Sequence, residues 1–244
     1  MDMIHEQAKQ YVDVITGQTV EEIKVGKNME VITHDRIFVA DAVIYAAGAS
    51  WKKLGVPGEK EFLGRGVSYC ATCDGAFYKD RITVVVGGGD VALEEAHFLT
   101  RFSSRVYLIH RRENFRGADI LQKRVLGCDR ITTVLNTVIE SIDGADTVKS
   151  VSLKNIVTGE ARRLETDGVF VFVGYDPNTS FLDDSLLNDK REVIVDMNMK
   201  TGIEGLFAAG DLRSGSKRQI VMAAADGATA ALSAYEYLTG TYCT

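Results

Sequence analysis

The chain has little proline, few cysteines and no long apolar run. Its 244 residues include 2 prolines and 4 cysteines. Four unevenly spaced cysteines are too few for a disulfide-stapled secreted scaffold, and no segment approaches the ~18 apolar residues that a membrane span requires. The N-terminus also lacks the basic and apolar regions of a signal peptide. These absences predict a cytoplasmic protein with no membrane segment.

Positive charge is also in deficit. The chain has 28 Lys+Arg against 34 Asp+Glu, a net charge of -6, which argues against a nucleic-acid partner. Hydrophobic residues at 45% and charged residues at 25% are typical of globular proteins and exclude disorder and coiled coils. Glycine, by contrast, is abundant at 23 residues. Much glycine with little proline indicates the tight strand-to-helix turns of an α/β fold.

A strand-turn-helix-strand unit lies in the middle of the chain. Residues 82–86 (ITVVV) predict a buried parallel strand, which runs into three glycines at 87–89. Residues 90–104 predict a helix, with small and apolar residues on one face. Residues 105–110 predict the next strand, so this stretch is typical of a nucleotide-binding βαβ unit.

The strand pattern occurs twice. After the βαβ unit, a meander with a turn at Asp143-Gly144 leads to a closing strand that ends in DGVFVFVG (167–174). Near the N-terminus another meander leads to DAVIYAAG (41–48), with Asp, Val and Gly at the same spacing. Two copies of one domain plan are therefore predicted. The predicted meander and closing strands are 20–25, 29–33, 37–39 and 42–46 in the first copy, and 138–142, 148–154, 162–165 and 169–173 in the second.

The spacing of the repeat predicts how the domains are divided. The first glycine of the turn, Gly87, precedes Gly174 by 87 residues (174 minus 87). The same spacing applied to Gly48 places the first copy's turn about forty residues before the start of the chain. A strand at 205–211 and a helix at 219–239 supply a C-terminal part of the first copy. We therefore expect two Rossmann-like domains, each with a β-meander, the first incomplete at its N-terminus. Their predicted bounds are 1–51 with 177–244, and an inserted 52–176.

The glycine turn fits the dinucleotide fingerprint. In Gly87-x-Gly89-x-x-Ala92, the glycines allow a tight turn and close approach of the pyrophosphate, and the alanine lets the helix pack on the strand. Asp90 at the start of the helix is a further candidate contact. The competing interpretation is a glycine turn in an unrelated α/β protein, which the strand and helix on either side make less favourable.

Basic residues follow the second strand of this unit. An NAD site typically has Asp or Glu there, whereas this chain has His110-Arg111-Arg112, with Arg116 shortly after. Planar guanidinium groups bind a phosphate in bidentate fashion, so these residues favour the 2′-phosphate of NADPH. A solvated basic strand end is the alternative.

Cys70 and Cys73 form a C-x-x-C pair. This spacing lets two sulfurs bond across one turn and is typical of redox dithiols. Zinc is the competing ligand, but the chain has no second C-x-x-C, so no metal is predicted. Asp74, the next residue, is a candidate proton donor to a leaving thiolate or an ordinary turn residue.

Four segments together resemble the bacterial low-molecular-weight thioredoxin reductases, over essentially the whole chain: CATCDGAFYKD (70–80), VVVGGGDVALEEA (84–96), HRRENFR (110–116) and FAAGDLR (207–213). The resemblance implies an FAD domain with an inserted NADPH domain. It also implies hydride transfer from NADPH to FAD, electron transfer to the C-x-x-C pair and then to thioredoxin, and a homodimer.

The resemblance also implies roles for individual residues. Cys70 and Cys73 correspond to the redox pair and Asp74 to its acid, and Gly87, Gly89, Arg111, Arg112 and Arg116 to NADPH contacts. Gly48, Gly210, Asp211, Arg218, Gln219 and Ile220 correspond to flavin contacts. One departure is Val91, where the family has Ser or Thr. Rotation of the inserted domain is expected at residues 51–58 and 175–179.

Two alternatives stay open. The absent first glycine turn suggests a flavin-free NADP-binding fragment without turnover. The C-x-x-C pair does not name its partner, so a reductase of another dithiol protein, such as a peroxiredoxin-type protein, is also compatible with the sequence.

Overall fold

The computed structural model of the chain describes residues 2–26 and 28–241 and divides into two compact units. One unit is continuous, Trp51–Tyr175, and we call it the inserted unit. The other combines Met1–Ser50 with Asp176–Thr244, and we call it the discontinuous unit. Within the described residues, no helix has the length and apolar character needed to cross a bilayer.

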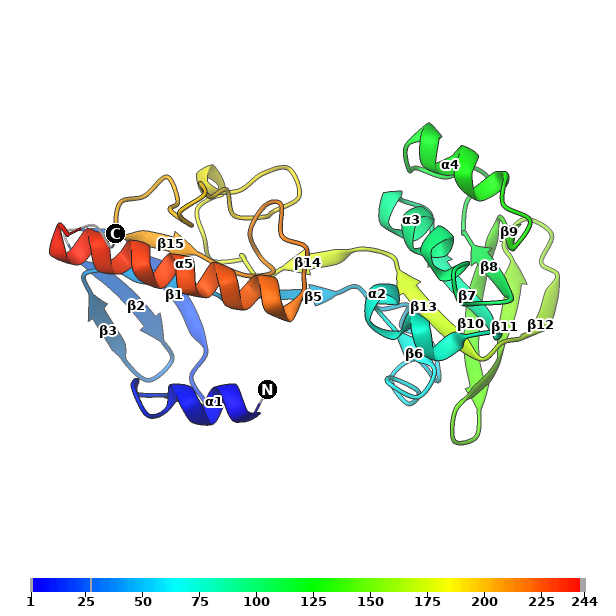
Figure 1. Cartoon of the computed structure of the whole chain (residues 1–244), viewed down its shortest axis with the longest axis horizontal. Helices are drawn as coiled ribbons and strands as arrows, with labels where there is room; N and C mark the ends of the chain where they lie inside the picture. Colours follow the sequence, from blue (N-terminus) through cyan, green and yellow to red (C-terminus); the bar gives the residue numbers. More distant parts are fainter. Residues whose placement is uncertain (1, 27, 242–244) are drawn as a thin grey trace. The chain divides into compact units, whose positions relative to one another are not determined.

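The inserted unit is built on a five-stranded parallel sheet (Figure 1). The strand order is β6-β13-β7-β8-β9, and the crossovers between sequential strands are of the kind that Rossmann-like folds use. The bounds are β6 Val67–Ser68, β7 Ile82–Gly87, β8 Arg105–Ile109, β9 Ile131–Val134 and β13 Gly168–Phe172.

Both faces of this sheet are covered, because alternate side chains of a strand point to opposite faces. Val85 packs with helices α3 (Asp90–Leu99) and α4 (Asp119–Leu126). Its neighbours Val84 and Val86 pack instead with the antiparallel meander. The meander strands are β10 Thr137–Gly144, β11 Val148–Asn155 and β12 Ala161–Glu165, which Figure 1 shows on the side of the sheet away from α3. A short helix α2 (Ala71–Asp74) and a 3-10 turn η1 (Gly75–Tyr78) precede β7.

The discontinuous unit has its own antiparallel meander and a parallel pair, β15-β4, which helix α5 contacts (Figure 1). Its buried residues form three small clusters, around Tyr45, Phe207 and Leu206. The bounds are α1 Asp2–Ala8, β1 Val20–Lys24, β2 Met29–Thr33, β3 Ile37–Ala40, β4 Val43–Tyr45, η2 Asp184–Leu186, β15 Leu206–Ala208 and α5 Ile220–Thr239.

The chain passes between the units twice. The two crossings are β5 (Ala49–Trp51) and β14 (Tyr175–Pro177), which pair with each other as a two-stranded sheet. The backbone N–H of Lys52 extends this pairing by donating to the carbonyl of Gly174 at 3.0 Å.

Most predicted elements are present, with two corrections. The helix expected over 90–104 ends at Leu99, where Thr100 is the C-cap. The turn expected at Asp143-Gly144 is wrong, because both residues pair in β10 and the chain turns over 145–147. Helix α4 and strand β9 were not predicted. The α/β class with a meander in each unit is confirmed.

Candidate functional site

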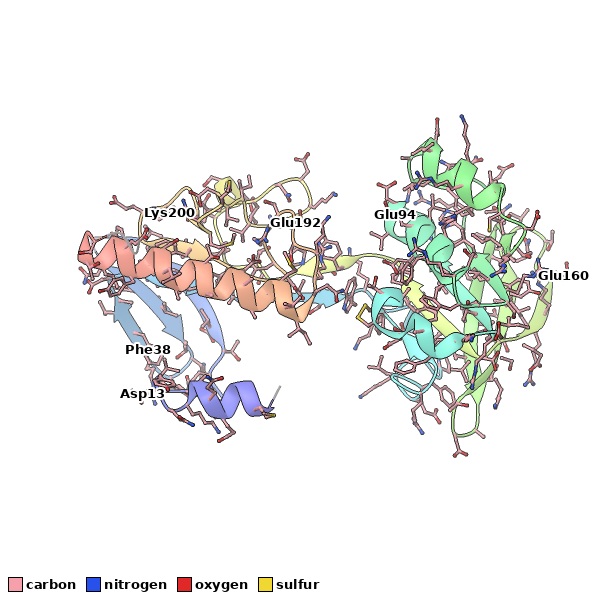
Figure 2. All side chains as sticks on the ribbon, in the orientation of Figure 1. Asp13, Phe38, Glu94, Glu160, Glu192 and Lys200 are labelled. Carbon is pink, nitrogen blue, oxygen red and sulfur yellow. A yellow bond between two sulfur atoms is a disulfide. The ribbon has the colours of Figure 1, made fainter. Side chains whose placement is uncertain are left out.

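Cys70 and Cys73 form a disulfide at the start of α2, with their Cα atoms 5.3 Å apart. Figure 2 shows the bond beside this helix. Cys70 is half-buried and Cys73 is exposed, so the pair lies at the surface of the inserted unit. Cys70 is also the N-cap of α2, and its Sγ accepts the Cys73 backbone N–H at 3.1 Å. The local helix therefore holds the two sulfurs at the same turn.

Ser68, in strand β6, connects this pair with Asp74. Its Oγ accepts the Cys70 backbone N–H at 3.0 Å, and its hydroxyl donates to Asp74 Oδ2 at 2.7 Å. Ser68 is buried and Asp74 is half-buried. The carboxylate of Asp74 is thus held on the helix that carries both cysteines, which is where a proton donor to a thiolate would have to be.

A cavity of about 350 Å³ lies next to Asp74. Its lining includes Phe77, Tyr78, Arg81 and Lys149. Burial, and secondarily the charge of Asp74, raises the pKa of Tyr78, so this phenol keeps its proton at neutral pH. The cavity beside Asp74 therefore has aromatic, basic and acidic side chains in its lining.

The glycine turn after β7 has the close packing that the fingerprint requires. Gly87 has φ 153°, and a Cβ there would overlap the Phe172 carbonyl and the Ala92 side chain. A Cβ at Gly88 would overlap the His110 ring. At Gly89, the N-cap of α3, a Cβ would meet nothing within 4 Å, and no side chain caps the helix there. The first amides of α3 are therefore open to an anion.

The basic segment lies against this turn. The backbone N–H groups of Arg116 and Gly117 donate to the Gly88 carbonyl, at 2.7 and 3.2 Å. Arg111, Arg112 and Arg116 are all exposed. The structure therefore brings the glycine turn and the three arginines together at the carboxyl ends of neighbouring strands β7 and β8.

His110 is a buried part of this arrangement. Only 5% of the residue is exposed, and its Nε2 lies 3.1 Å from the Asn114 carbonyl. Burial is the main cause that lowers the pKa of His110, and the charges of Arg116 and Arg112 lower it further. The neutral ring of His110 thus packs against Gly88 and supports the turn.

Asp90 has a structural partner. Its Oδ1 accepts the backbone N–H of Ala118 at 2.7 Å, which attaches the start of α4 to the start of α3. This contact places the carboxylate toward the α4 segment.

The candidate flavin residues lie together in the discontinuous unit. Gly48 and Gly210 follow the paired parallel strands β4 and β15, with φ 68° and 85°. The half-buried Asp211 comes next, and the segment that leads to α5 ends in Arg218 and Gln219. Ile220, the first residue of α5, is 65% exposed. In both units, therefore, the candidate cofactor residues follow the carboxyl ends of parallel strands.

Two buried ion pairs hold that segment. Arg213 donates to both carboxylate oxygens of Asp226, each at 2.7 Å, and Asp226 Oδ2 also accepts the Gly210 N–H at 3.2 Å. Arg218, which has φ 52°, donates to Glu192 Oε1 at 2.8 Å. Glu192 is labelled in Figure 2. The guanidinium of Arg218 therefore has a buried carboxylate as its partner.

The sequence interpretation missed Ser68, Glu192, Arg213 and Asp226. Asp226 has a readable signal, because it stands four residues before Ala230 on the buried face of α5, where an acid needs a partner. The pairing of Arg218 with Glu192 joins residues 26 apart and has no comparable signal. Cys128 is unpaired and half-buried, and no cluster of metal-ligating side chains occurs in residues 2–26 and 28–241.

Comparison with known proteins agrees with this geometry. Residues 3–227 match the family model described as pyridine nucleotide-disulphide oxidoreductase. Thioredoxin reductase of Helicobacter pylori is 47% identical over 88% of this chain and 72% of its own length. That of Bacillus subtilis is 43% identical, over 96% of this chain and 75% of its own length. The chain spans from 66% to 75% of the curated relatives' lengths.

Solved structures give the same result. The thioredoxin reductase of Streptococcus pyogenes is 40% identical, with a TM-score of 0.92, over 99% of this chain and 79% of that one. The thioredoxin reductase of Giardia duodenalis has a TM-score of 0.93 at 36% identity, over 97% of this chain and 79% of that one. The chain therefore belongs to the pyridine nucleotide-disulphide oxidoreductase family, and within it to the thioredoxin reductases.

Proposed function

We propose that the protein is an NADPH-dependent flavoprotein that reduces the disulfide of thioredoxin. The observation that carries this proposal is the Cys70–Cys73 disulfide in the same unit as an arginine-flanked dinucleotide turn. Names of the relatives support thioredoxin as the acceptor.

NADPH is assigned to the inserted unit. The open space at Gly89 and the uncapped start of α3 fit a pyrophosphate. Arg111, Arg112 and Arg116 are exposed beside the turn, so their guanidinium groups are available to a 2′-phosphate. Val91, 46% exposed on the first turn of α3, offers no hydroxyl to a phosphate.

FAD is assigned to the discontinuous unit. The left-handed backbone at Gly48 and Gly210 has no side chain above it: a Cβ at Gly48 would meet nothing within 4 Å, and one at Gly210 only Ala223, at 3.7 Å. Backbone without side chains at adjacent strand ends fits close approach of a planar cofactor, and Asp211 offers a carboxylate to ribityl hydroxyl groups. When bound, FAD would accept a hydride from NADPH and pass two electrons to the disulfide.

The dithiol transfers those electrons. Two electrons and two protons convert the Cys70–Cys73 disulfide into two thiols. One of them, as the thiolate, attacks the acceptor disulfide to form a mixed disulfide, and the other displaces the reduced acceptor and restores the Cys70–Cys73 bond. Asp74, held by Ser68 at 2.7 Å, is the candidate that protonates the thiolate leaving in this cycle.

The test is turnover by the full chain supplied with FAD. Purified protein should bind FAD, oxidise NADPH and reduce thioredoxin, and Cys73→Ser should abolish reduction while NADPH still binds. Cys128→Ser is the matched control, because Cys128 has no disulfide partner. A chain that takes up no FAD and binds NADPH without turnover would be the flavin-free alternative.

Three further assignments accompany this function: the acceptor, the compartment and the oligomeric state. Assaying thioredoxin against peroxiredoxin-type proteins distinguishes the acceptors. The cytoplasm is the proposed compartment, because a reductant supply keeps such dithiols cycling there. A homodimer is proposed from the family relationship, and light scattering of the purified chain measures it.

A further inference from the structure

Three aromatic side chains meet where the chain enters and leaves the inserted unit. The Trp51 ring stacks on Tyr69, with centroids 6.4 Å apart and planes at 11°. Tyr175 contacts the same Trp51 ring edge-on, at 6.2 Å. Trp51 and Tyr175 are the ends of the two crossings β5 and β14. Tyr69 therefore shares one cluster with both connections.

A buried carboxylate fixes Tyr69 from another side. Glu59 is only 3% exposed, and its Oε1 accepts the Tyr69 hydroxyl at 2.8 Å. The same carboxylate accepts the backbone N–H groups of Leu54 and Gly55, each at 2.8 Å. Burial and the neighbouring Glu59 raise the pKa of Tyr69, so the phenol remains a donor at any physiological pH. Glu59 thus ties Tyr69 to the segment 54–59 that follows the first crossing.

Tyr69 is also the residue directly before Cys70. We propose that Tyr69, held by Trp51 and Glu59, is a positioning residue that couples the redox state of Cys70–Cys73 to the two chain crossings. This role rests on the proposed function but adds residues that the reaction itself does not use.

The direction of the coupling follows from the state that the structure contains. The stack and the hydrogen bond accompany the disulfide form, in which Cys70 is also held by Ser68. In our proposal these contacts are stronger in the disulfide form, so removing them should destabilise that form more than the dithiol form. Because coupling is reciprocal, the variant's disulfide should be easier to reduce.

The first test measures the equilibrium between disulfide and dithiol. The full chain is equilibrated without oxygen in mixtures of reduced and oxidised dithiothreitol, and the labelled Cys70–Cys73 peptide is quantified by mass spectrometry. Tyr69→Phe keeps the ring and removes the hydroxyl, and it should shift the equilibrium about tenfold toward the dithiol, or about 30 mV. Tyr107→Phe, a matched change in strand β8, should shift it less than twofold.

The second test uses Trp51, which is the chain's single tryptophan. Its emission should change along the same titration as the thiol labelling. In Tyr69→Ala the emission change should disappear while thiol labelling still proceeds. If the emission change persists in Tyr69→Ala, the sulfurs quench the indole directly and no coupling exists.

Two other outcomes would also overturn the proposal. One is an unchanged equilibrium in both Tyr69→Phe and Glu59→Gln, the second variant serving where the first folds poorly. The other is an emission of Trp51 that does not depend on the redox state. Neither outcome touches the proposed function, which fails separately if the wild-type chain with FAD does not reduce thioredoxin.

Discussion

In the inserted unit, helices cover one face of a five-stranded sheet and a meander covers the other, whereas the discontinuous unit distributes its buried side chains over three small clusters. The discontinuous unit instead buries two ion pairs, Arg213–Asp226 and Arg218–Glu192. The comparison teaches that the two candidate nucleotide sites are positioned by different forces. Packing on the apolar sheet and backbone hydrogen bonds to the Gly88 carbonyl hold the glycine turn of the first, and charged hydrogen bonds hold the segment before α5 in the second.

The largest effect is expected at Asp226. Asp226→Ala leaves the mostly buried Arg213 without its carboxylate and the Gly210 N–H without its acceptor. Breaking one partner of a buried pair costs about 3 to 5 kcal/mol. Urea unfolding, monitored by hydrogen exchange in each unit, should show this loss of stability in the discontinuous unit. The stability of the inserted unit should stay the same.

A double variant serves as the control for that experiment. In Arg213→Met with Asp226→Leu, no unpaired charge remains, so at least half of the lost stability should return. If Asp226→Ala alone changes the unfolding free energy by less than about 1 kcal/mol, the ion pair is not what holds the segment.

Matched buried leucines compare the apolar cores. Leu99 is fully buried in the inserted unit, and Leu206 is 2% exposed in a cluster of three buried residues. Leu→Ala costs about 2 to 5 kcal/mol and more where the surroundings cannot relax. We expect about 4 kcal/mol for Leu99→Ala and about 2 kcal/mol for Leu206→Ala. Each is measured from the urea transition of its own unit.

The exposed Leu238 provides the baseline for these measurements. It is 55% exposed on α5, so Leu238→Ala should change stability by less than about 0.5 kcal/mol. Equal losses for Leu99→Ala and Leu206→Ala would mean that the two cores are equally rigid, contrary to the comparison.

The sequence predicted those elements of the inserted unit that follow local rules. An apolar β-branched run gave β7, and Gly87 gave the turn, since a Cβ at Gly87 would overlap the Phe172 carbonyl and the Ala92 side chain. Strand β9 and helix α4 escaped, because β9 carries polar Thr132 and Thr133 and α4 has one buried residue, Val125. Short elements with little apolar periodicity give no pattern to read.

The positions of the candidate site residues were predictable, but their supports were not. Arg218 was expected to meet a cofactor, yet its guanidinium binds Glu192, 26 residues earlier. Tyr69, Glu59 and Trp51 likewise meet only after folding. Contacts between residues far apart in the chain leave no local pattern, so only the structure reveals them.

The third prediction tests whether the arginines beside the glycine turn bind the 2′-phosphate of NADPH. Arg111→Ala with Arg112→Ala removes two exposed guanidinium groups without touching the buried His110. NADPH affinity should fall about 10- to 100-fold, and NADH affinity should change less than about threefold, because only NADPH carries the 2′-phosphate. Titration calorimetry measures both.

An arginine elsewhere on the inserted unit controls for the loss of positive charge. Arg163→Ala in β12 removes an exposed guanidinium paired with Glu165 and should leave both affinities unchanged. Equal weakening of NADPH and NADH by the double variant would place the arginines on a phosphate that the two nucleotides share.

The smallest effect concerns pH and His110. Burial lowers the pKa of His110 in the folded chain below the unfolded value of about 6.5. The unfolded chain therefore binds the extra proton first, and the stability of the inserted unit falls as pH drops below about 6.5. One such group contributes a slope of at most about 1.4 kcal/mol per pH unit.

The urea midpoint, monitored by Trp51 emission, should decrease from pH 7.5 to pH 5.5. His110→Gln, which cannot titrate, should have a shallower slope. Identical slopes in the wild-type chain and the variant would mean that the buried His110 ring takes up its proton as easily as in the unfolded chain.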